Sequence, residues 1–136
     1  MLGVSKSFHS MDHGDVDPAD TVRAAVGDVS QIEITGVQIL VGTYIRPEKF
    51  KSGIIQTAKV REEDIHQGKV GLVLKVADGA FVDGGEAKFN GFKVSPGDWV
   101  FYRVQDGFST SVNGHHCRLI EDVHVRGRVP HPDLIL

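Results

Sequence analysis

Cysteine is nearly missing from this chain: Cys117 is the single one among 136 residues. One thiol excludes an internal disulfide framework and any zinc cluster built on several cysteines. Long apolar runs are missing too, since none approaches the roughly 20 residues that cross a bilayer. The first ten residues carry one Lys and no apolar stretch. We therefore expect no signal peptide, no membrane partner and a cytoplasmic protein.

The chain also lacks a strong excess of charge of one sign. Its 15 Lys and Arg stand against 18 Asp and Glu, for a net charge of -3 with the seven His neutral. This balance offers no basic surface for nucleic acid. The acidity is concentrated in residues 1–36, which hold six acidic side chains and two basic ones. Since 40% of the residues are hydrophobic, the chain has the material for a core.

The first 31 residues read as an N-terminal arm that contains one short helix. Asp17 is suited to cap a helix, and Pro18 to occupy its first position. Gly27 is a typical stop. The sequence therefore predicts a helix over residues 18–27 within an arm over residues 1–31.

Residues 32–129 have the texture of a β domain, followed by a tail over residues 130–136. Sixteen glycines and many β-branched residues favour short strands and tight turns. We expect strands over residues 32–45, 68–77, 99–104 and 123–129, and a hairpin around Asn113-Gly114. This pattern predicts an all-β fold, a small barrel or sandwich, with the first and last strands at its edges. The expected core comprises Val37, Ile39, Val41, Val70, Leu72, Leu74, Val100, Leu119 and Val123, with Trp99, Phe101 and Tyr102 divided between core and subunit contact.

Two groups of histidines are candidates for metal sites. His9 and His13 are spaced to share an ion on a helix, but Ser10 and Gly14 favour an irregular arm. His115, His116 and Cys117 are zinc-type donors, but neighbouring residues on a strand point to opposite faces. We expect a strand with Cys117 turned inward as a small hydrophobic side chain, and no metal site.

No catalytic motif is present. The chain has no G-x-S-x-G elbow, P-loop or G-x-G-x-x-G. Consecutive carboxylates, Glu62-Glu63-Asp64 and Glu121-Asp122, indicate solvated turns. The sequence therefore predicts neither an enzyme nor a cofactor.

A long charged loop over residues 48–67 is the most unusual stretch. Ile54 and Ile55, after Gly53, form an isolated aliphatic pair among charged side chains. Loops of this length are usually functional or disordered. A polar segment with two aliphatic residues suits docking into an apolar groove of a partner. The alternative is that both isoleucines fold back onto the domain.

The order of these features resembles the GroES-type co-chaperonins, the ring-shaped lids of GroEL-type chaperonins. The resemblance is carried by the strand Val37 to Ile45, the loop with Ser52-Gly53-Ile54-Ile55, the strand Gly68 to Val76, the segment Val94 to Phe101 and the stretch Arg118 to Val125. It covers about residues 36–127. In that family a G-[small or charged]-V-x-x-V strand follows the mobile loop. A K-V-G-D-x-V-x-[FY] strand follows a glycine-rich roof hairpin, here residues 78–91.

This resemblance implies a GroES-like β-barrel that assembles into a homo-heptameric ring. Each mobile loop docks its aliphatic residues into the chaperonin, which implies Gly53, Ile54, Ile55 and Gln56 as the partner-binding residues. The lid closes a cavity in which a client protein folds while the chaperonin hydrolyses ATP, and it carries no chemistry itself.

The chain departs from the family at three places. Gln56 stands where family loops carry a third aliphatic residue, which predicts weaker docking. The long arm and the extended tail resemble elaborations of divergent bacteriophage-encoded members. The alternative function is a structural or assembly protein, such as a virion decoration or connector module, in which arm and tail interlock between subunits.

Overall fold

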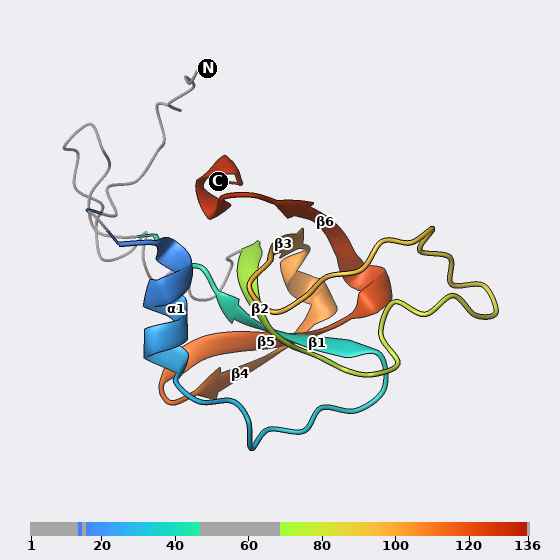
Figure 1. Cartoon of the computed structure of the whole chain (residues 1–136), viewed down its shortest axis with the longest axis horizontal. Coiled ribbons are helices and arrows are strands. Elements are labelled where there is room, and N and C mark those ends of the chain that lie inside the picture. The colour runs from blue at the N-terminus through green and yellow to red at the C-terminus, as the bar shows by residue number, and fades with distance from the viewer. Residues whose placement is uncertain (1–13, 15, 47–68, 136) are drawn as a thin grey trace.

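The computed structural model describes residues 14, 16–46 and 69–135. One helix, α1 (Pro18–Val26), packs beside a single twisted sheet of six strands (Figure 1). The strands are β1 (Gln38–Thr43), β2 (Val70–Val76), β3 (Trp99–Tyr102), β4 (Gly107–Val112), β5 (His115–Glu121) and β6 (Val125–Val129). The described residues also include the 3-10 turns η2 (Val104–Asp106), η3 (Asp122–His124) and η4 (Pro132–Leu134). The fold is thus mostly β, as the sequence predicts.

Helix α1 forms where the sequence predicts it. Asp17 caps it: its Oδ1 accepts a hydrogen bond from the Ala19 N–H at 2.9 Å. The helix ends at Gly27, whose φ of +77° lies in the left-handed region that favours glycine. The N–H of Gly27 donates to the Arg23 carbonyl at 2.8 Å. Local capping chemistry therefore fixes both ends of the helix.

The sheet order is β4-β5-β1-β2-β3-β6, and every neighbouring pair is antiparallel. Strand β1 is central, so the prediction that the first strand is an edge is wrong. Backbone pairing explains the difference, because β1 hydrogen-bonds with both β2 and β5. The last strand is an edge, as predicted, and β4 is the other. No ladder joins β4 to β6 among the described residues.

The first strand is also shorter than predicted. Residues 32–37 lie outside it, and Gly36 has a φ of +68°, which breaks the extended run before β1. Ile32 and Ile34 still pack against the core without joining the ladder. The alternation of apolar residues at positions 32–34 therefore predicts which side chains pack against the core, but it does not predict that these residues pair in the sheet.

Each face of the sheet has its own apolar cluster. The helix face, as we call the side against α1, carries the cluster Ala19, Val22, Val26, Leu40, Tyr44, Val70, Leu72, Trp99 and Cys117. The opposite face carries Ile39, Val41, Val73, Val94, Val100, Tyr102 and Ile120. Leu74, Phe101 and Leu119 are partly buried against the first cluster. The aromatic residues of β3 thus divide between the two faces.

Two predicted core residues are exposed instead. Val37 is 39% exposed because it precedes β1, and its carbonyl accepts a hydrogen bond from the Asp122 N–H at 3.0 Å. Val123 is 51% exposed because it belongs to η3, where the alternation of a strand does not apply. The final strand accordingly begins at Val125, two residues later than predicted.

The hairpin of β4 and β5 is confirmed. Asn113 and Gly114 connect the strands with φ values of +51° and +83°, which identify a type I′ turn. The Asn113 side chain donates to the Val26 carbonyl at the end of α1. The turn therefore closes the hairpin and also binds the carboxyl end of the helix.

Candidate functional site

The predicted docking residues, Gly53, Ile54, Ile55 and Gln56, lie outside the described residues. So do His9 and His13. The structure does describe both flanks of the segment that contains the docking residues. The Tyr44 N–H donates to the Val70 carbonyl at 3.0 Å, and the Tyr102 N–H donates to the Lys69 carbonyl at 2.9 Å. Residues on either side of the segment 47–68 are therefore bound to one another and to β3.

Tyr44 at this base also contacts the C-terminal tail. Its ring packs edge-on against Trp99 with a centroid distance of 5.6 Å, and its hydroxyl donates to Asp133 Oδ1. Asp133 is buried, and its own N–H donates to His131 Nδ1 at 3.1 Å. The tail therefore packs on the residue that precedes the predicted loop.

A second candidate region is the Gly-rich segment over residues 78–91, which the resemblance assigns to a roof. It consists of turns and one isolated bridge between Gly84 and Ala87. Phe81 packs edge-on against Phe89 and Phe92, with centroid distances of 5.4 and 5.9 Å. Phe81 and Phe92 also pack against the cluster of the opposite face. The segment therefore covers that face through its aromatic rings.

Asp122 ties this segment to the end of β5. Its Oδ2 accepts a hydrogen bond from the Phe81 N–H at 2.9 Å, although Asp122 is only 5% exposed. The prediction that Glu121-Asp122 is a solvated turn is therefore wrong for Asp122. Phe81 has a φ of +61°, which is a strained conformation for a bulky side chain. The buried carboxylate stabilises this backbone by accepting its N–H.

Arg128 of β6 makes the second tie. Its Nη1 donates to the Lys93 carbonyl at 2.8 Å and lies 3.4 Å from Asp98 Oδ2. The guanidinium also lies over the Phe92 ring, 5.1 Å from its centroid, in a cation–π contact. Asp122 thus binds the Gly-rich segment near its start, and Arg128 binds Phe92 and Lys93, which directly follow it.

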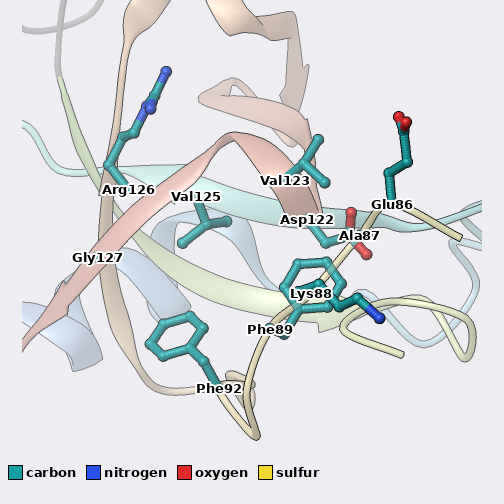
Figure 2. A pocket seen from close by; sticks show the side chains of 10 residues that line it. All are labelled: Glu86, Ala87, Lys88, Phe89, Phe92, Asp122, Val123, Val125, Arg126 and Gly127. Carbon is teal, nitrogen blue, oxygen red and sulfur yellow. The ribbon is translucent and has the colours of Figure 1, made fainter. Parts of the chain in front are cut away.

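Between this segment and β6 lies an open groove of about 460 Å³. Figure 2 shows the rings of Phe89 and Phe92 on one side of it and Val123 and Val125 on the other, while Arg126 points away. The groove is therefore lined by apolar rings and valines together with the charged residues Glu86, Lys88, Asp122 and Arg126.

The His115-His116-Cys117 run does not form a group of metal ligands. His115 Nε2 donates to the Thr43 carbonyl at 2.9 Å, whereas His116 Nδ1 lies 2.8 Å from the Thr43 hydroxyl. Cys117 is fully buried on the helix face, as predicted, and its burial raises the pKa of its thiol to about 11. The thiol is protonated at neutral pH. Among the described residues, no three His, Cys, Asp or Glu side chains gather as metal ligands do.

Sequence reasoning missed the structural roles of Asp122, Arg128 and Asp133. Each is a charged residue next to an apolar strand or tail, where its contacts come from residues distant in sequence. Strand β6 reads Val-Arg-Gly-Arg-Val with both arginines exposed, so no local signal indicates the contacts of Arg128. None of the described helices has the length and apolar character needed to cross a membrane.

No protein-family model matches the chain, and no curated protein sequence matches it.

Proposed function

We propose that this protein is a ring-forming lid of the GroES type that caps a GroEL-type chaperonin through Gly53, Ile54, Ile55 and Gln56. The observation that supports this most is the course of the chain. A central strand is followed by the predicted loop, a strand antiparallel to the first, a Gly-rich segment and a tight turn into β3. The resemblance implies the same order.

The tight turn before β3 fits the resemblance in detail. The Asp98 N–H donates to the Ser95 carbonyl at 3.0 Å, and Gly97 has a φ of +101°. These values are those of a type II turn, which Pro96 at its second position and Gly97 at its third position favour. The turn sets β3 antiparallel to β2 and thereby fixes how the Gly-rich segment returns to the sheet.

The flanks of the predicted loop suit a docking role. Tyr44 and Val70 are joined by a backbone hydrogen bond, so the loop would leave and rejoin the domain at one fixed base. A fixed base limits the conformational entropy that docking costs. Burying one isoleucine contributes about 1.5–3 kcal/mol, so one loop binds weakly and a ring that engages several sites binds usefully.

The unpaired edges of the sheet support self-assembly. Strands β4 and β6 each have one neighbour among the described residues. In the proposed heptamer, contacts between copies cover these edges and complete the barrel. The lid works in the cytoplasm without a cofactor, and ATP is hydrolysed by the chaperonin.

The test is capture of a GroEL-type chaperonin, with and without nucleotide. Ile54→Ser with Ile55→Ser should abolish capping and leave the mass of the free assembly unchanged. Val16→Ser with Val82→Ser is the matched control, because both valines are exposed and lie outside the loop. Gln56→Leu should tighten capping. Normal capping by the double isoleucine variant, or its unfolding, would exclude the loop as the docking element.

The second candidate is a structural or assembly protein on the same sheet, since unpaired edges serve a shell as well as a lid. That function expects arm and tail to interlock between subunits. Helix α1 and the tail at Asp133 instead pack on their own sheet. We therefore rank this function second, and an assembly that never binds a chaperonin would promote it.

A further inference from the structure

The two outer edges of the sheet run in opposite directions. Six strands alternate from β4 to β6, so the first and the last are antiparallel to one another. A second copy in the same orientation can therefore place its β4 beside β6 and continue the antiparallel sheet. No hydrogen bond of the described residues occupies the outer edge of either strand.

Strand β4 has none of the features that usually protect an edge. Its sequence, GFSTSV, contains no charge and no proline. Phe108 is 67% exposed, the most exposed large hydrophobic side chain among the described residues. It pairs with Leu119, which packs against the cluster of the helix face, so Phe108 stands on that face.

Strand β6 offers a matching position on the same face. Gly127 is paired with Phe101, and Phe101 packs against the helix-face cluster. The Phe101 ring lies across the glycine, since a Cβ added there would come within 2.6 Å of Phe101 Cε1. An aromatic side chain on the next strand can cover such a glycine and contact the ring beyond it.

We propose that this chain assembles head to tail, with β4 of one copy added to β6 of the next and Phe108 set opposite Gly127. This register places Ser109 opposite Arg126 on the other face. Pairing of β6 with a second β6 is disfavoured, because it would bring the exposed Arg126 and Arg128 of both copies together. Pairing of β4 with β6 brings no like charges together, because β4 carries no charged side chain. The inference rests on the self-assembly in the proposed function and is independent of the chaperonin contact.

The first test is the mass of Phe108→Thr in solution, measured by native mass spectrometry and light scattering over a dilution series. Threonine keeps the preference for a strand, so the monomer should remain folded by circular dichroism. The dissociation concentration should rise at least about tenfold, as for a residue central to an interface. Val82→Thr is the control, because Val82 is 62% exposed and lies outside β4 and β6. It should leave the mass unchanged.

The second test fixes the register. Ser109→Cys with Arg126→Cys in one chain should give a ladder of disulfide-linked oligomers on a non-reducing gel, and each single substitution should give none beyond a dimer. The buried Cys117 thiol does not compete in the folded protein. A wild-type monomer at every concentration overturns both this inference and self-assembly. An oligomer that survives Phe108→Thr and yields no ladder overturns this interface alone and leaves the proposed lid in place.

Discussion

The two faces of the sheet are covered in different ways. On the helix face, α1 lies so close that Gly42 has no room for a side chain: an added Cβ would stand 2.6 Å from Val22 Cγ1. On the opposite face, the Gly-rich segment is bound by the Asp122 carboxylate and the Arg128 guanidinium. One cover depends on apolar packing, and the other depends on aromatic rings fixed by a few polar contacts. We therefore expect substitutions on the helix face to lower the stability of the whole domain. Substitutions in the polar contacts of the opposite face should loosen only the Gly-rich segment.

The largest effect should come from Leu72→Ala. Leu72 is fully buried in the helix-face cluster, and its truncation leaves a cavity beneath α1. The free energy of unfolding should fall by about 2–5 kcal/mol, measured by urea denaturation. Leu134→Ala is the control, since Leu134 is 62% exposed and its truncation should cost little. Equal losses in the two variants would refute the role assigned to the helix face.

Gly42→Ala tests the close approach of the helix directly. The new methyl group would displace Val22, at a cost of about 1–3 kcal/mol. Hydrogen exchange in α1 should quicken along with the loss of global stability. Gly84→Ala is the matched control, because nothing lies within 4 Å of its added Cβ. Unchanged exchange in α1 would mean that the helix adjusts without strain.

Asp122→Ala should open the Gly-rich segment rather than unfold the sheet. It leaves the strained Phe81 N–H without its acceptor, a local cost of about 1–3 kcal/mol. Hydrogen exchange over residues 78–92 should quicken while the urea midpoint changes less than in the helix-face variants. Asp122→Asn keeps an acceptor oxygen and should restore part of the protection. Loss of the whole fold in the alanine variant would contradict the division into two covers.

The smallest effect should come from Arg128→Met. The contacts of Arg128 with Asp98 and Phe92 are partly exposed, so their loss should cost no more than about 1 kcal/mol. Exchange should quicken near Lys93 only. Arg23→Met, which breaks an exposed pair with Asp20 on the helix side, is the comparison and should not change that exchange. A large drop in melting temperature for Arg128→Met would show that the segment supports the whole sheet.

The features predicted correctly from the sequence are those with local causes. Asp17, Pro18 and Gly27 determine the helix ends within a few residues, and Asn113-Gly114 determines the hairpin. The burial of Cys117 also follows from the alternation of its strand. These signals act over short stretches of chain, so the order of residues alone carries them.

The errors concern partners that are distant in sequence. Nothing near β1 indicates that it will pair on both sides, and nothing near Asp122 indicates that the Phe81 N–H will approach it. The alternation around Val123 predicts a strand, whereas Val123 lies in η3 and is exposed. The proposed docking residues rest on the resemblance and on the isolated Ile54-Ile55 pair, so they stay a prediction.

The buried thiol of Cys117 can report how often the sheet opens. Cys117 is the one cysteine of the chain, and it lies on β5 between β4 and β1. Because burial raises the pKa of this thiol to about 11, an alkylating reagent should modify it only when the sheet opens. The rate at which the reagent labels Cys117 would then measure the frequency of local opening at the centre of the sheet. A ligand or a neighbouring copy that adds a strand to β4 should lower the rate of Cys117 labelling, even where it leaves the average structure unchanged.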